Sequence, residues 1–83
     1  MFEIIFDKRA FKELAQLENE AQQLIWSKIT ELKEGNFTND KALKGNHKGK
    51  FRKRAGSYRI VYLKEGTILL ITIIRIAHRK EVY

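Results

Sequence analysis

The chain has 83 residues, a formal net charge of +7 and a sequence pI of about 9.9, and it contains neither cysteine nor proline. This length predicts one domain over residues 1–83 with a modest hydrophobic core. The absence of cysteine excludes disulfides and cysteine-based metal sites, so we expect no metal and no other cofactor. The longest apolar stretch, residues 68–76, is too short to cross a bilayer as a helix, and no signal peptide is recognisable, which predicts a soluble cytoplasmic protein.

The charge is divided unevenly between the two halves of the chain. Residues 1–40 carry 5 basic and 8 acidic side chains, whereas residues 41–83 carry 12 basic and 2 acidic ones. Such segregation indicates an anionic partner, which is a nucleic acid, an anionic membrane surface or an acidic protein.

The N-terminal half predicts one strand and two helices. Residues 2–6 form a short apolar strand, and Asp7 then stands where an N-cap would begin a helix over residues 8–17. Asn19 is expected to cap a second helix over residues 21–34. The apolar residues of both helices recur at helical spacing, so each helix should bury one face against a sheet. Trp26 lies off that stripe and is expected to be half-exposed.

The C-terminal half predicts three strands. A Gly56-Ser57 turn joins the first two as a β-hairpin, and a second turn at Glu65-Gly66 leads into residues 67–76. The last run is almost continuously apolar and β-branched, which predicts a central strand buried on both faces. The order β-α-α-β-β-β predicts an α+β fold with two N-terminal helices packed on a small, mainly antiparallel sheet.

A dense basic run coincides with this hairpin. Its members, with no acidic residue among them, are Lys41, Lys44, Lys48, Lys50, Arg52, Lys53, Arg54 and Arg59. Strand alternation places Arg52 and Arg54 on one face, and a two-residue turn would add Arg59 to it. The alternative is a solvated surface that serves solubility alone, but the single sign of the charge favours a phosphate-binding site, for which guanidinium groups are well suited. Lys53 points to the packed face, and we expect it to lie on an edge strand with its ammonium group in water.

The C-terminal segment adds titratable groups. His78, Arg79 and Tyr83 follow the last strand, and a hydroxyl or imidazole beside the arginines would form a proton-transfer set. Taken alone, a histidine at position 78 is more often solvated than functional, and the same holds for His47 in the loop between Asn36 and Gly49.

The chain resembles the RelE/ParE superfamily of bacterial and archaeal toxins, in particular its RelE-like branch. The segments that carry the resemblance are F-D-K-R-A-F-K-E-L-A-Q-L, A-L-K-G, F-R-K-R-A-G-S-Y-R-I-V-Y and R-I-A-H-R-K-E-V-Y, in the same order as in the family. The resemblance implies the toxin of a type II toxin–antitoxin system. Its activity would be a metal-independent, ribosome-dependent endoribonuclease that cleaves mRNA in the A site by attack of the 2′-OH on the adjacent phosphate and so inhibits translation. The implied partners are the ribosome, mRNA and a small acidic antitoxin with an amphipathic helix, with no membrane and no small-molecule ligand.

The resemblance also implies roles for individual residues. Arg59 and Arg79 would bind phosphate and stabilise the transition state, and Tyr83 or His78 would transfer protons. Arg54 falls on a catalytic position of the family. The implied RNA-binding residues are Lys44, Lys48, Lys50, Arg52 and Arg54. The toxin that gives the branch its name carries lysines at the positions of Arg52 and Arg54, and an arginine cannot act as a neutral base as a lysine can.

Two other functions remain open at this point. A ParE-type toxin that poisons DNA gyrase would share the fold without needing the basic hairpin. A basic RNA-binding relative with weak or no catalysis would keep the charge, and the arginines at positions 52 and 54 leave this possibility open.

Overall fold

The computed structural model describes residues 1–45, 49–78 and 80. The strands form one five-stranded sheet in the order β1-β5-β4-β3-β2, in which β1 pairs with β5 in parallel and all other pairs are antiparallel. The elements are β1 (Glu3–Phe6), α1 (Lys8–Ala15), α2 (Asn19–Lys33), β2 (Lys41–Ala42), β3 (Lys50–Ala55), β4 (Tyr58–Glu65) and β5 (Leu70–His78). The predicted fold class is confirmed, and β2 is an addition that the sequence did not reveal.

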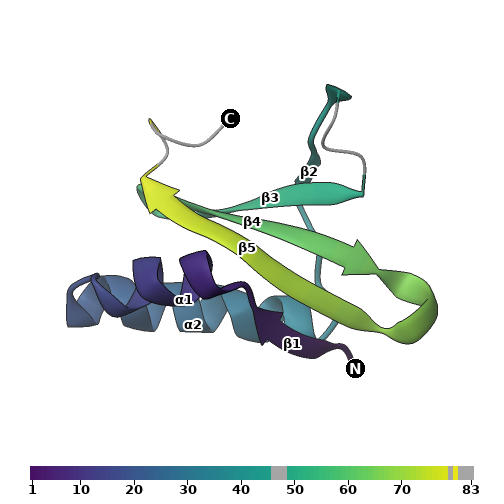
Figure 1. Ribbon diagram of the computed structural model, residues 1–83, viewed down its shortest axis with the longest axis horizontal. Coiled ribbons are helices and arrows are strands. Elements are labelled where there is room, and N and C mark those ends of the chain that lie inside the picture. The colour runs from purple at the N-terminus through teal and green to yellow at the C-terminus, as the bar shows by residue number, and fades with distance from the viewer. Residues whose placement is uncertain (46–48, 79, 81–83) are drawn as a thin grey trace.

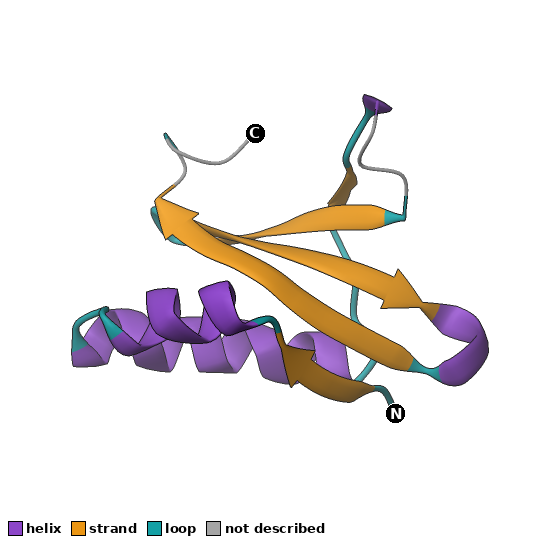
Figure 2. Cartoon of the chain, in the orientation of Figure 1, coloured by secondary structure: helices purple, strands orange, loops and turns teal. Residues whose placement is uncertain are grey.

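The two helices lie side by side along one face of the sheet (Figure 1). Among the described residues, no helix covers the other face, which Figure 2 shows as bare strands above the helical layer. We call these the helix-covered face and the open face. No helix in the described part of the chain is long and apolar enough to span a membrane.

The helix ends follow local sequence signals. Asp7 caps α1, because its carboxylate accepts a hydrogen bond from the Lys8 N–H at 3.0 Å. At the end of α2, Gly35 has φ +82°, and the N–H of Asn36 donates to the carbonyl of Glu31, which is the Schellman pattern. The predicted cap at Asn19 is wrong: α2 begins at that residue, and Glu18 stands at the N-cap without a side-chain hydrogen bond.

The main core lies between the helices and the helix-covered face. Its fully buried large side chains come from α2, β4 and β5, and they are Ile25, Leu32, Ile60, Tyr62, Ile71, Ile73 and Ile76. Trp26 is 47% exposed, as expected from its place beside the apolar stripe. Phe11, an apolar residue of α1, is 59% exposed.

The last strand differs from its prediction. β5 lies next to the edge strand β1 and not at the centre of the sheet. Its first five residues alternate between partly exposed and buried, whereas Ile76 and Ala77 are both buried, in different clusters. β1 ends at Phe6, opposite Ile73. Beyond that point Glu13 of α1 protects the strand edge, because its carboxylate accepts from the backbone N–H of Ile76 and from Arg75, both at 2.8 Å. The apolar run therefore reflects one buried face plus a helix packed along an edge.

Candidate nucleic-acid interface

Four cationic side chains share the open face at the β2–β3–β4 end of the sheet. Arg54 lies directly opposite Arg59 across the hairpin, and Lys41 lies opposite Arg52. Strand alternation places Arg52 and Arg54 on the same side of β3. Directly opposed like charges are unfavourable in a sheet, so this arrangement is suited to an anion that neutralises them. We call these four residues the cationic face.

The register of the hairpin depends on its turn. Gly56 has φ +60°, which is the conformation required at the first central position of a type II′ turn. A Cβ at this position would also lie 2.9 Å from the Cδ2 of Leu24 on α2. Both the positive φ and the lack of space for a Cβ therefore favour glycine at position 56. The turn sets the strand register in which Arg54 pairs with Arg59.

A small second core supports the open face. Val61 and Ala77 are 1% and 6% exposed, and Leu43 and Ile74 pack against them. Leu43 anchors the chain that leaves β2, and its N–H donates to the Lys50 carbonyl at 2.9 Å. The loop that connects β2 to β3 thus begins and ends beside the cationic face.

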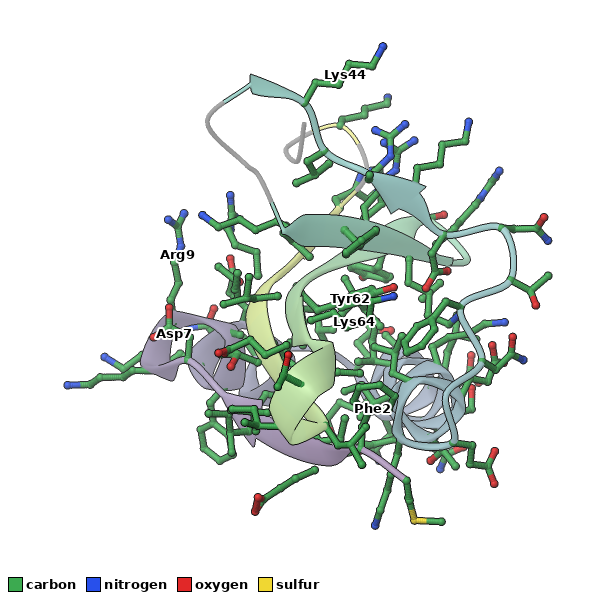
Figure 3. All side chains as sticks on the ribbon, turned by 90° about the vertical axis from the view of Figure 1, so that its right-hand side faces the viewer. Phe2, Asp7, Arg9, Lys44, Tyr62 and Lys64 are labelled. Atoms are coloured by element: carbon green, nitrogen blue, oxygen red, sulfur yellow. The ribbon has the colours of Figure 1, made fainter. Side chains whose placement is uncertain are left out.

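The structure describes two of the three predicted RNA-binding lysines. Lys44 is exposed, and Figure 3 shows it extending from the end of the molecule opposite the helices. Lys50 is half-buried in β3, opposite Leu63. Lys48 lies outside the described residues.

Of the predicted proton-transfer set, only His78 belongs to the described residues. His78 pairs with Tyr58, and the two rings meet edge to face with centroids 5.9 Å apart. Tyr58 packs against the main core, so His78 lies toward the helix-covered face, whereas its neighbour Ala77 faces the open side. Arg79 and Tyr83 lie outside the described residues.

The prediction that the ammonium group of Lys53 lies in water is wrong. Its side chain is only 4% exposed, and its Nζ contacts Asp40 Oδ1 at 3.1 Å and Glu31 Oε1 at 3.3 Å. It also donates to the Asn36 carbonyl at 3.3 Å. The phenol of Tyr62 donates to the other oxygen of Asp40 at 2.5 Å. We call this set, Lys53, Asp40, Glu31 and Tyr62, the buried ionic cluster.

The cluster shifts the titration of two of its members. Burial raises the pKa of Tyr62, and the hydrogen bond and the charge of Asp40 raise it further. Burial also acts to raise the pKa of Glu31, but the hydrogen bonds and charges of Lys28 and Lys53 outweigh it, so this pKa lies below its usual value. The cluster therefore favours a neutral tyrosine and an ionised carboxylate.

A second lysine is held by aromatic rings, which the sequence did not indicate. The Nζ of Lys64 lies 4.3 Å from the ring centroid of Phe37 and 4.9 Å from that of Phe51, and Tyr62 stacks with both rings. Figure 3 shows Lys64 close to Tyr62. Three residues far apart in sequence create this site, so it has no local signal, and its contacts are those of a structural cation–π interaction.

Among the described residues there is no group of three or more His, Asp or Glu side chains that could hold a metal ion. The cationic face can bind an anion because it holds four cations side by side, and it would contribute charge stabilisation.

Comparison with solved structures shows a shared fold. The isolated RelE toxin of E. coli matches with a TM-score of 0.80 and 22% identity, over 94% of this chain and 84% of that chain. YafQ from E. coli strain BL21(DE3) matches with a TM-score of 0.80 and 12% identity, over 100% and 99% of the two chains. The intact E. coli RelBE toxin–antitoxin complex matches with a TM-score of 0.77 and 20% identity, over 94% and 96%.

The identities to these solved structures are too low to assign the chain to a family, but a family model does assign it. No curated protein sequence matches the chain. The model described as the ParE toxin of the type II toxin–antitoxin system parDE matches residues 4–83. Because this match spans nearly the whole chain, the expected superfamily is confirmed, and the protein belongs to the ParE toxin family of the RelE/ParE superfamily of type II toxins.

Proposed function

We propose that this toxin is a ribosome-dependent endoribonuclease that cleaves mRNA in the A site and so inhibits translation. The observation that carries the proposal is the Arg54–Arg59 pair on the open face, extended by Lys41 and Arg52. A run of cations on a surface that no helix of the described residues covers suits an RNA backbone.

In the proposed reaction the 2′-oxygen of the RNA attacks the adjacent phosphorus. The new O2′–P bond forms as the P–O5′ bond breaks, which leaves a 2′,3′-cyclic phosphate and a free 5′-hydroxyl. Arg59, with Arg54 and Arg79, would stabilise the charge that develops on the phosphate oxygens. Arg52 and the lysines at positions 44, 48 and 50 would hold the backbone on either side.

Proton transfer needs a base for the 2′-OH and an acid for the 5′-oxygen. The arginines stay charged at any working pH and cannot serve as the base. We assign the proton transfers to Tyr83 before His78, because His78 lies beside Tyr58 toward the helix-covered face.

The proposed regulatory partner is an acidic antitoxin with an amphipathic helix. Two relatives are described as toxin–antitoxin complexes, and a third is a RelE mutant in complex with an antitoxin peptide. The basic C-terminal half of this chain would attract such a partner. Exposed apolar surface is also present at Phe11 and Trp26, which both contact Phe6 edge to face.

Poisoning of DNA gyrase is the second candidate function, and the match to a ParE family model favours it. A basic RNA-binding protein with little catalysis is the third, since arginine replaces the tunable lysine at two positions.

Primer extension on a reporter mRNA in a cell-free bacterial translation system tests the first proposal. Wild-type protein should produce translation-dependent cuts within codons, and an Arg79→Ala, Tyr83→Phe variant should not. Lys8→Ala serves as a control, because it removes an exposed cation on α1, away from the cationic face. Intact mRNA with folded wild-type protein would refute the nuclease, and inhibition of gyrase supercoiling in a parallel assay would then support the second candidate.

A further inference from the structure

A cleft of about 700 Å³ opens beside the cationic face, at the free edge of β3. Its walls come from α2, from the loop that precedes β2 and from the hairpin. The cleft is lined by three arginines that also belong to the cationic face, namely Arg52, Arg54 and Arg59. An anion held by these arginines therefore lies at the mouth of a cavity large enough for a nucleotide.

We propose that this cleft is a nucleoside subsite, which receives the RNA nucleoside next to the phosphate bound by the arginines. The proposal rests on the proposed function as an RNA-binding toxin, and it assigns substrate recognition to residues that the sequence did not indicate. In particular it assigns base recognition to Asn39 and to the exposed backbone of β3.

The charge of the cleft suits a nucleotide. Six of its lining side chains are cationic and two are acidic. Both acids already have cationic or phenolic partners: Glu31 contacts Lys28 and Lys53, and Asp40 contacts Lys53 and Tyr62. The carboxylates are therefore engaged in the wall, and the cleft keeps the positive potential that an RNA backbone requires.

The loop that carries Asn39 is held in a fixed position. One carboxylate oxygen of Asp40 is bound by Lys53 and the other by Tyr62. The backbone N–H of Asp40 donates to the Phe37 carbonyl at 3.1 Å. Asn36 holds the same loop, because its side-chain oxygen accepts from the Thr38 N–H at 3.1 Å. Asn39, which lines the cleft, adopts φ +67°, a conformation that asparagine tolerates better than most residues. Its amide offers a donor and an acceptor, as hydrogen bonding to a base edge requires.

The edge of β3 offers a second pair of hydrogen-bonding groups. The Lys50 carbonyl accepts from Leu43, so the even-numbered residues of β3 turn their backbone groups toward the β2 side. β2 begins at Lys41, opposite Arg52, and in the described part of the chain no strand lies opposite Arg54. The backbone N–H and carbonyl of Arg54 therefore face the cleft, where a planar base can bind them.

Asn39→Gly tests the subsite, because glycine accepts the positive φ without strain and removes only the amide. Leu69→Gly is the matched control, since Leu69 also has a positive φ (+53°) and lies in the turn before β5, outside the cleft. Cut sites are mapped in the translation assay for wild type and both variants. The preference of the wild type among bases at the cut site should fall at least about fivefold in Asn39→Gly and remain in Leu69→Gly. An unchanged preference in Asn39→Gly overturns the subsite and leaves the nuclease proposal standing.

Direct binding separates failure of the subsite from failure of the nuclease. The probes are 2′-O-methyl RNA trinucleotides, which lack the attacking hydroxyl, with either a base or an abasic sugar at one position. Wild type should bind the best intact probe at least about fivefold more tightly than its abasic counterpart, and Asn39→Gly should lose most of this difference, because only the β3 backbone would still contact the base. Equal or absent binding by wild type overturns the subsite. Base-dependent binding without any mRNA cleavage supports the subsite and overturns only the nuclease.

Discussion

The two faces of β3 use the same type of side chain for opposite purposes. Lys53 points to the helix-covered face, where its side chain is 4% exposed and its ammonium group is bound by Asp40 and Glu31. Its neighbours Arg52 and Arg54 point to the open face and join Arg59 and Lys41 in a single-signed surface. Residues of one basic run therefore lie in different surroundings according to the face that they occupy. The buried cation is held by two carboxylates of the fold, and we propose that the cationic face binds RNA.

Removal of the buried cation should have the largest effect on stability. Lys53→Met leaves the Asp40 carboxylate, which is only 4% exposed, without its cation, so we expect a loss of about 3–5 kcal/mol in the free energy of unfolding. This is a large part of the roughly 4–12 kcal/mol typical for a chain of this length. Urea denaturation followed by circular dichroism measures it. Arg54→Met, the same change on the exposed face, should cost no more than about 0.5 kcal/mol, and similar losses in both variants would contradict the distinction between the faces.

Removal of the exposed pair should instead affect activity. Arg54→Ala with Arg59→Ala should lower mRNA cleavage by about 10²–10³-fold, because the developing phosphate charge loses its donors. The free energy of unfolding of this variant should fall by much less than that of Lys53→Met, because Arg54 is exposed and Arg59 is only partly buried. Cleavage rate and urea stability measured on one preparation test both statements. A large loss of stability would assign the pair to the fold.

The phenol of the buried ionic cluster should contribute less than the lysine. Tyr62→Phe removes the donor to Asp40 and should cost about 1.5–3 kcal/mol at neutral pH, as expected for a hydrogen bond to a charged group. The pKa of Tyr62 is raised in the folded protein, so this contribution is complete below pH 10.0, the ordinary value, and declines as pH rises further. The difference in stability between wild type and Tyr62→Phe should therefore narrow above pH 10. Parallel curves up to pH 11 would show that the phenol titrates as it does in the unfolded chain.

The smallest effect is expected at the solvent edge of the cluster. The pKa of Glu31 lies below its ordinary value of 4.5, so its contribution is present above that pH and is lost as pH falls through the lowered value. The side chain is 34% exposed, and solvent screening limits the effect of Glu31→Gln to less than about 1 kcal/mol. Thermal midpoints measured between pH 3 and pH 7 should show a shallower acid dependence for this variant. Glu34→Gln, an equivalent change on an exposed side chain, should follow the wild-type curve.

The sequence by itself determined the features that depend on neighbouring residues. Asp7 and Gly35 fix helix ends through local hydrogen bonds and a positive φ. The Gly56-Ser57 turn fixes the pairing of Arg54 with Arg59, because a two-residue turn permits one register. The helix order, the hairpin and the basic surface were accordingly predictable from spacing and charge.

The tertiary structure decided everything that depends on residues far apart in the chain. The fate of Lys53 required Glu31 from α2 and Asp40 from the following loop, and neither lies in its own strand. The short strand β2, the parallel pairing of β1 with β5 and the position of His78 beside Tyr58 also arise from long-range pairing. A local pattern specifies which side of a strand a residue faces. It does not specify what the fold brings to that side, and for a cation this decides whether its charge is neutralised within the protein or is available for a partner.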